Sequence, residues 1–145
     1  MGIIRNLAYK AGQVTGEAKR KKDSIERANQ QDTNTRAFIE NLHNIAQGGD
    51  VEAMYNLGCY YNEGSYVILD MEKACYWWTN AAERGHISAQ YNLGCLYIGE
   101  VSASYYDVNL AGYWFNCAAN NGDTDAMERL REFKYSNFSQ KWKLR

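Results

Sequence analysis

The chain has 145 residues, of which 46% are hydrophobic and 23% are charged, a balance typical of one globular domain and not of a disordered chain. The formal net charge of −1 is unevenly distributed, because residues 37–128 contain twelve acidic and two basic side chains, whereas residues 1–36 and 129–145 are basic. A protein that binds nucleic acid needs a basic surface on its folded body, so this distribution argues against that class and favours a protein partner with a basic surface.

The N-terminal segment, residues 1–34, lies outside the repeats described below. It contains a helical stripe of apolar residues, Ile3, Leu7, Ala11 and Val14. One interpretation is a basic amphipathic helix on an anionic membrane surface, with "KRKK" at 19–22, but the stripe is short and contains Gly12 and Gly16. We favour a helix that caps the open first edge of the helical domain at residues 35–145.

Targeting signals are not evident in the sequence. The N-terminal segment has no uninterrupted apolar core and no small-residue cleavage site, so it does not resemble a secretory signal. No apolar run approaches the roughly 20 residues that span a bilayer. We therefore expect a cytoplasmic protein whose four cysteines are reduced.

The sequence repeats itself after about 36 residues. "YNLGCYYNEG" at 55–64 recurs as "YNLGCLYIGE" at 91–100, and "DMEKACYWWTNAAERG" at 70–85 matches "DVNLAGYWFNCAANNG" at 107–122. Self-similarity at a fixed period of 20 to 50 residues is typical of stacked repeat architectures.

Two full units and two partial ones follow from this alignment. The full units cover about 49–84 and 85–121. A half unit at 41–49 precedes them, and a partial third copy occupies 122–133.

Each unit is predicted to fold as an antiparallel helix pair. In the first half, Ala53, Leu57 and Tyr61 recur every four residues, Asp50 stands at an N-cap position, and Gly64 ends the helix. The second half carries the same signals at Asp70, Ala74, Trp77, Trp78, Ala81, Ala82 and Gly85. The chain has no proline to interrupt these helices.

The pattern resembles the Sel-one-like repeat, a relative of the tetratricopeptide repeat: Ala, then "LG", Tyr, Gly, a loop that ends in Asp, "KA", an aromatic pair, "AA" and Gly. The match runs from about residue 37 to about 134. In the third copy Arg131 replaces the Gly of "LG", so that copy is predicted to be a terminal cap. The resemblance implies an all-α fold, a right-handed α-α superhelix of antiparallel helix pairs, and a role as a protein-interaction scaffold or adaptor.

The cysteines and histidines do not predict a metal or cofactor site. Cys59 and Cys95 hold equivalent positions, so they should lie about one repeat apart, which is too far for a disulfide. No C-x-x-C pair occurs, and His43 and His86 are the only imidazoles. A zinc site would need ligands from scattered helices. We therefore expect no cofactor and no metal, and interpret the cysteines as small packing residues.

One cysteine-rich, secreted branch of the family is linked with penicillin binding, and its cysteines join the helices at a fixed short spacing. Here Cys59 and Cys75 are 16 residues apart, and Cys95 and Cys117 are 22 apart, so the regular pattern is missing. We do not carry that activity over. A cysteine-dependent hydrolase with Cys59 or Cys95 as nucleophile is the enzymatic alternative.

The resemblance implies that a partner binds on the concave side, which the first helix of each unit lines. The positions on that side, by analogy with tetratricopeptide relatives, are Glu52, Tyr55, Cys59, Ser88, Tyr91, Cys95, Glu128 and Glu132. This aromatic, thiol and acidic stripe suits a peptide or small protein with basic groups. The alternative is that Tyr55 and Tyr91 pack between successive repeats.

The two loops within the units form a second candidate surface. Residues 64–70 and 99–107 contain Tyr66, Tyr105 and Tyr106, large aromatic side chains that turns do not require. The C-terminal "FSQKWKLR", with Phe138 and Trp142 one helical turn apart, is expected to cover the far edge of the domain.

We therefore predict a non-enzymatic module that binds another protein. Short, acidic, cytosolic bacterial members of the family resemble inhibitors or immunity factors as well as adaptors, and both roles stay open. A peripheral membrane scaffold, held by the N-terminal helix, is the second alternative. The sequence leaves the oligomeric state open.

Overall fold

Helices form all the regular structure in the described part of the chain, as the period predicts. The computed structural model describes residues 2–30 and 33–132, with side chains from Gly16 onward. The elements are α1 (Gly2–Asn29), α2 (Thr33–Gln47), α3 (Val51–Glu63), α4 (Met71–Glu83), α5 (Ile87–Tyr97), the 3-10 turn η1 (Ala103–Tyr105) and α6 (Val108–Asn120). A further helix begins at residue 124 and continues to residue 132. Among these residues, no helix is long and apolar enough to cross a membrane.

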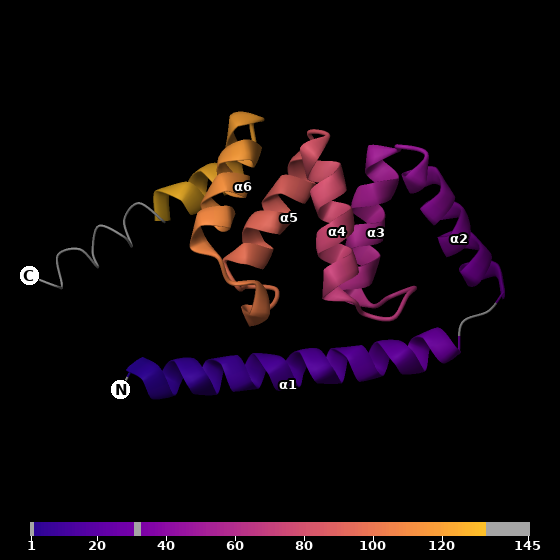
Figure 1. Cartoon of the computed structure of the whole chain (residues 1–145), viewed down its shortest axis with the longest axis horizontal. Helices are drawn as coiled ribbons and strands as arrows, with labels where there is room; N and C mark the ends of the chain where they lie inside the picture. The colour runs from indigo at the N-terminus through magenta and orange to yellow at the C-terminus, as the bar shows by residue number, and fades with distance from the viewer. Residues whose placement is uncertain (1, 31–32, 133–145) are drawn as a thin grey trace, which may run out of the picture.

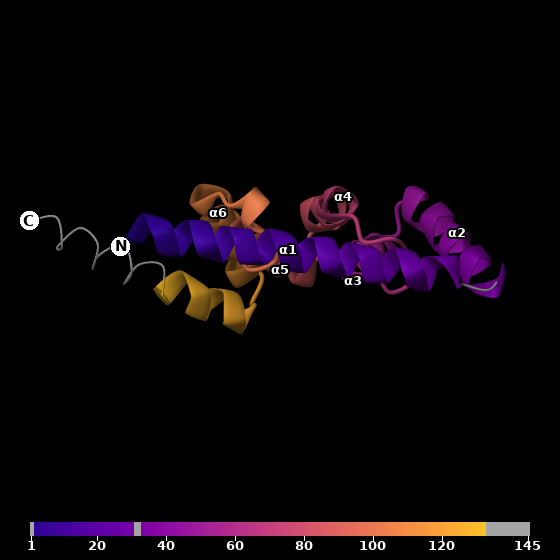
Figure 2. The same cartoon turned by 90° about the horizontal axis from the view of Figure 1, so that it is seen from below.

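The helices of the repeats lie in two layers. Figures 1 and 2 show α2, α4 and α6 in one layer and α3, α5 and the helix at 124–132 in the other. The closest packing is within the pairs α3/α4 and α5/α6, followed by that of α4 on α5. The predicted all-α solenoid of helix pairs is therefore confirmed.

The helix ends follow the signals in the sequence. Asp50 Oδ1 accepts a hydrogen bond from the backbone N of Ala53 at 2.7 Å, and Asp70 Oδ1 accepts one from Lys73 N at 3.0 Å, so both predicted N-caps are confirmed. Gly64 ends α3 in the left-handed region, with φ of 63°. A third cap is the imidazole of His86, whose Nδ1 accepts a hydrogen bond from Ala89 N at 3.2 Å at the start of α5.

The "LG" glycines make room for the aromatic side chains of the partner helix. A Cβ atom on Gly58 would collide with the indole of Trp78, and one on Gly94 would lie 2.5 Å from the ring of Phe115. Trp78 and Phe115 hold equivalent positions and are almost completely buried. Each helix pair therefore packs an aromatic ring of its second helix on the bare backbone of its first.

Helix α1 crosses the loop ends of the units instead of covering the outer side of α2 (Figures 1 and 2). Ser24 is fully buried, and its Oγ accepts a hydrogen bond from Leu69 N at 2.8 Å. Arg20 Nη2 donates to the carbonyl of Asn62 at 2.7 Å, and Ser102 Oγ donates to Glu17 at 3.1 Å. The side chains of the predicted stripe at Ile3 to Val14 and the predicted C-terminal cover lie outside the described residues.

Candidate functional site

Tyr55 bridges the two full units. Its ring stacks on the imidazole of His86, with centroids 4.3 Å apart and planes at 18°. The same imidazole contacts Glu52 through Nε2 at 3.1 Å, and because its Nδ1 accepts the capping bond, Nε2 is the donor to the carboxylate. Burial raises the pKa of Tyr55 to about 12. The first pair of predicted contact residues therefore holds two repeats together.

Tyr91 occupies the equivalent position at the next junction. It lies edge-to-face on Phe115, with ring centroids 5.6 Å apart. Arg129, from the third copy, reaches back to Glu100 at 3.0 Å, and its hydrogen bond to Tyr91 raises the pKa of the guanidinium. Both tyrosines are half-buried, so the geometry favours the interpretation that they pack between repeats.

The cysteines beside these tyrosines are half-buried thiols. All four cysteines are free. Burial raises the pKa of Cys95 to about 11 and also raises the pKa of Cys59, so both are protonated at neutral pH. Within the described ranges, no group of three His, Cys, Asp or Glu side chains could hold a metal ion. This environment does not activate a thiolate nucleophile.

The polar residues of the predicted stripe are exposed. Glu52, Ser88, Glu128 and Glu132 all lie at the surface, on the helices of the layer that contains α3 and α5. The stripe is therefore a row of exposed polar side chains, mostly carboxylates, beside tyrosines that pack at the junctions between repeats. Its contact with a partner stays a prediction.

The three loop tyrosines have different surroundings. Tyr66 is 42% exposed and packs with Tyr60 and Phe38, at centroid distances of 4.8 and 6.1 Å. Tyr105 is half-buried against the core near Tyr97, while Tyr106 is 61% exposed. Tyr106 is thus the loop tyrosine most accessible to a partner.

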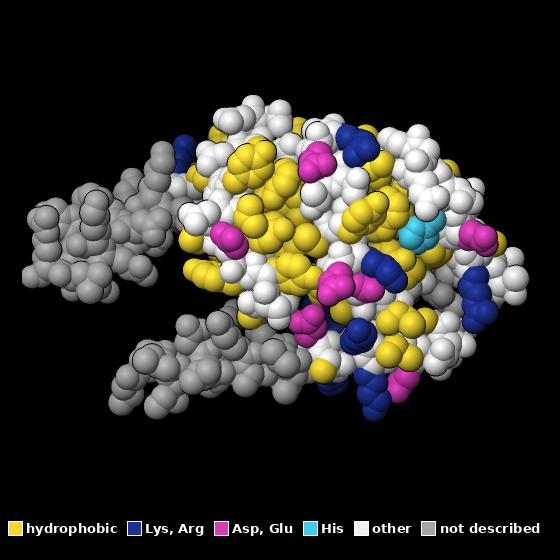
Figure 3. Space-filling view, viewed as in Figure 1, with side chains coloured by type: hydrophobic (Ala, Val, Ile, Leu, Met, Phe, Trp, Pro, Cys, Tyr) yellow, Lys and Arg dark blue, Asp and Glu magenta, His cyan; other side chains and the backbone are white. Residues whose placement is uncertain are grey.

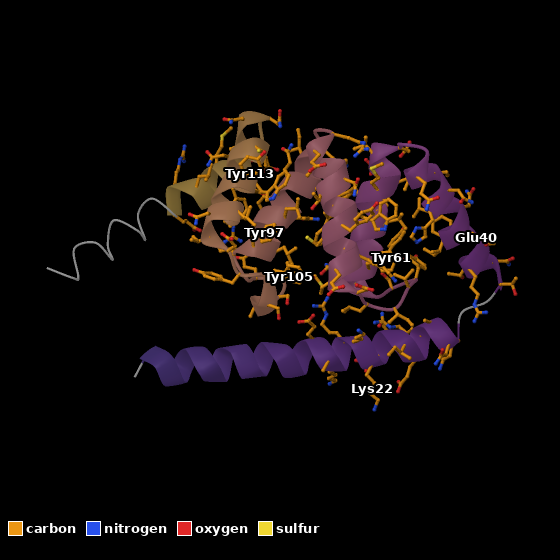
Figure 4. The ribbon with its side chains drawn as sticks, viewed as in Figure 1. Lys22, Glu40, Tyr61, Tyr97, Tyr105 and Tyr113 are labelled. Carbon is orange, nitrogen blue, oxygen red and sulfur yellow. The ribbon has the colours of Figure 1, made fainter. Side chains whose placement is uncertain are left out.

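Sequence reasoning missed two exposed tyrosines on the opposite layer. Tyr76 on α4 and Tyr113 on α6 hold equivalent positions and are 59% and 58% exposed. Each lies edge-to-face on the tryptophan that follows it, at 5.1 and 5.0 Å. The signal was present in "YWW" and "YWF", since a residue next to a buried tryptophan points about 100° away from it on a helix. Figure 3 shows apolar side chains over this face, and Figure 4 places Tyr113 on it.

The fold and these surfaces define the class: an α-solenoid of tetratricopeptide-like helix pairs. The family model of the Sel1 repeat matches residues 51–86 and 87–123, half of the chain, and the chain therefore belongs to the Sel1 repeat family. Proteins of this family generally mediate protein–protein interactions. The family is the one that the residue pattern resembles.

Two solved structures share the fold. A Sel1 repeat protein from Oxalobacter formigenes is 28% identical, with a TM-score of 0.62 over 88% of this chain and 98% of that one. A protective antigen of uropathogenic Escherichia coli strains that displays an SLR fold is 33% identical, with a TM-score of 0.58 over 63% of this chain. The match covers 20% of that antigen's chain. No curated protein gives a significant match.

Proposed function

We propose that this protein binds a partner protein, and that the contact surface of the partner is basic. The observation that carries the proposal is the pair of exposed tyrosines, Tyr76 and Tyr113, at equivalent positions in a stretch where residues 74–128 contain one basic residue, Arg84. Tyrosines contribute large contact areas at interfaces, and the carboxylates of the same stretch attract lysine and arginine.

The exposed carboxylates of the α3 and α5 layer belong to the same proposal. Glu52, Glu128 and Glu132 give that layer an acidic surface. Because Tyr55 and Tyr91 are engaged between repeats, their removal should loosen the array, whereas removal of Tyr76 and Tyr113 costs each unit only an edge contact with the neighbouring tryptophan and should mainly affect a bound partner. Variants of the two tyrosine pairs therefore distinguish a loss of stability from a loss of contact with the partner.

The proposal includes a non-enzymatic role in the cytoplasm, as an inhibitor or immunity factor or as an adaptor. It is supported by the raised pKa of the Cys59 and Cys95 thiols, which disfavours a cysteine nucleophile. Affinity distinguishes the two binding roles. An inhibitor should hold its target with nanomolar strength, about −12 kcal/mol, whereas an adaptor can work near a micromolar dissociation constant, about −8 kcal/mol.

The test is affinity capture from native lysate with the full chain, read by mass spectrometry, followed by calorimetry with the purified partner. We expect a partner with a basic contact surface, and binding that weakens as salt is raised. The Tyr76→Ala, Tyr113→Ala double variant should lose most of the affinity and remain folded, with a melting temperature lowered only slightly by the lost edge contacts with Trp77 and Trp114. A partner with an acidic contact surface, or full affinity in the double variant, would contradict the proposal.

A further inference from the structure

A hollow of about 790 Å³ opens between α1, α2 and the loop from α3 to α4. Its size falls in the range of about 300–1,000 Å³ that is usual for ligand sites. The walls are largely apolar and aromatic, with Ile39 from α2, Ile68 from the loop and Tyr61 at the base. Figure 4 shows Tyr61 between α2 and α4, on the face that Figure 3 displays.

Three basic side chains line this groove, and each comes from a different element. They are Lys21 of α1, Arg36 of α2 and Lys73 of α4. In the described part of the chain, no carboxylate lies within 4.0 Å of the charged groups of Lys21 or Arg36. Lys73 contacts Asp70 at 3.4 Å and lies 5.2 Å from the centre of the Tyr61 ring. Two of the three cations are thus available to a ligand.

The acidic residues of the groove do not neutralise it. Asp70 and Glu40 are the two carboxylates in the lining, and Asp70 is already engaged, as the N-cap of α4 and the partner of Lys73. Glu40 lies near the middle of α2, and its carboxylate is more than 4.0 Å from the guanidinium of Arg36. The rest of the body is acidic, whereas basic side chains outnumber the acidic ones in this groove.

The next junction of the same chain shows that the cations are not needed for packing. At the equivalent positions between α4 and α6, Glu72 replaces Arg36 and Leu110 replaces Lys73, whereas Tyr97 keeps the place of Tyr61. Both tyrosines pack in the core. The repeat therefore requires the tyrosine, and the basic residues are a property of the first junction alone.

The base of the groove offers polar groups beside the apolar walls. His43 Nε2 and the Tyr61 hydroxyl lie 3.0 Å apart, and the imidazole lies edge-to-face on Trp77 at 5.5 Å. These contacts fix both rings without a further partner. A ligand that enters between Ile39 and Ile68 therefore meets an ordered base, which lowers the entropy cost of binding.

We propose that this groove binds an acidic segment of a partner protein, extended, with at least two carboxylates and one aliphatic side chain. The carboxylates contact Lys21, Arg36 and Lys73, and the aliphatic side chain lies between Ile39 and Ile68. This groove lies at the first junction of the face that carries the exposed tyrosines, but it has the opposite charge and does not depend on them. The protein then holds two ligands of opposite charge.

The test uses the full chain and a labelled peptide in which glutamate alternates with leucine and glycine, acetylated and amidated, read by fluorescence anisotropy at low salt. We expect saturable binding, and no binding of the peptide in which lysine replaces each glutamate. Lys21→Glu and Arg36→Glu should each weaken binding about tenfold or more, as expected for charges in direct contact with the ligand.

Lys22→Glu is the matched control, because it makes the same change in charge one residue further along α1, where Lys22 points away from the body (Figure 4). It should change the affinity by less than about twofold, since an exposed charge beyond the site acts only through screened solvent. Arg36→Glu recreates the residue of the next junction, so it should fold, and circular dichroism verifies this for all three variants.

Equal weakening by Lys21→Glu and Lys22→Glu would overturn the proposal, because the binding would then follow the net charge of α1 and not the groove. Equal affinity for the lysine peptide would overturn it as well. Sedimentation with anionic vesicles that Lys22→Glu abolishes and Arg36→Glu preserves would assign the basic residues to a lipid surface. Either failure leaves Tyr76 and Tyr113 untouched, so the proposed function is tested separately.

Discussion

His86 is the N-cap of the first helix of the second unit, a position that aspartate occupies in the units on either side. Asp50 caps α3, and Asp123 Oδ1 accepts from Ala126 N at 2.8 Å at the start of the helix at 124–132. At position 86 the cap is a ring nitrogen, and the ring adds a stacked contact with Tyr55 and a hydrogen bond to Glu52. One side chain thus begins a helix and joins two repeats.

This double role gives a stability prediction. His86→Ala removes the cap and the stacked contact, and should lower the free energy of unfolding by about 1–2 kcal/mol. His86→Asp restores the cap but places a second carboxylate near Glu52, so its loss should be smaller than that of alanine. Urea unfolding measures both variants. An alanine variant as stable as the wild type would show that the cap contributes nothing.

Two helical glycines should respond in opposite ways to the same substitution. Gly58→Ala forces a methyl group into the indole of Trp78 and should destabilise the fold by about 1–3 kcal/mol. Gly112→Ala, in α6, meets no atom within 4 Å and should stabilise the fold by up to about 1 kcal/mol through helix propensity. Thermal unfolding of the pair is the measurement, and a loss at both positions would contradict this account of the "LG" glycine.

The imidazole of His43 predicts acid sensitivity. Burial, with a smaller effect from Lys73, lowers the pKa of His43 in the folded state. The unfolded chain therefore binds a proton more readily, so this contribution to stability is present above about pH 6.5 and is lost as the pH falls below it. The melting temperature should drop between pH 7.5 and pH 5 by more in the wild type than in His43→Gln. Equal drops would assign the acid sensitivity to other groups.

The thiols supply a chemical prediction. With the pKa of Cys95 raised to about 11 and that of Cys59 also raised, iodoacetamide at pH 7.4 should modify neither faster than it modifies free cysteine. Mass spectrometry of the labelled peptides follows each site. Rapid labelling of one of them would instead support the hydrolase alternative.

At the scale of the element, one small polar side chain is the buried contact between α1 and the repeats. Ser24 fills the space above Gly64 and accepts the hydrogen bond of Leu69 N. Ser24→Val removes that acceptor and leaves the buried N–H unpaired, a cost of about 1–3 kcal/mol. The α1 amides of residues 16–29 should then exchange with deuterium faster. Ala18→Val, an exposed change on the same helix, is the control and should leave exchange nearly unchanged.

The repeat helices were predictable from sequence because their signals are local. The four-residue recurrence of Ala53, Leu57 and Tyr61 and the caps at Asp50 and Asp70 all lie within one helix. The docking of α1 was not predictable, because it needs a serine in a charged stretch to meet a loop 45 residues further along the chain. No periodic pattern marks such a contact.

At the scale of the whole molecule, the candidate surfaces were predictable only in part. The family resemblance supplied the layer that carries Glu52 and Tyr55, but it could not show that Tyr55 is engaged by His86. The basic groove was beyond sequence reasoning, since Lys21, Arg36 and Lys73 are scattered over 53 positions and come together only after α1 turns back along the loops.

Helix α1 touches both full units, through Asn62 and Leu69 in the first and Ser102 in the second. In an array of repeats that contact only their neighbours, the solenoid can bend at each junction and change its curvature when a partner binds. A long helix that contacts two successive units opposes such bending. A change in the angle between the two units should therefore break one of these contacts, so we expect α1 to limit the bending of the solenoid.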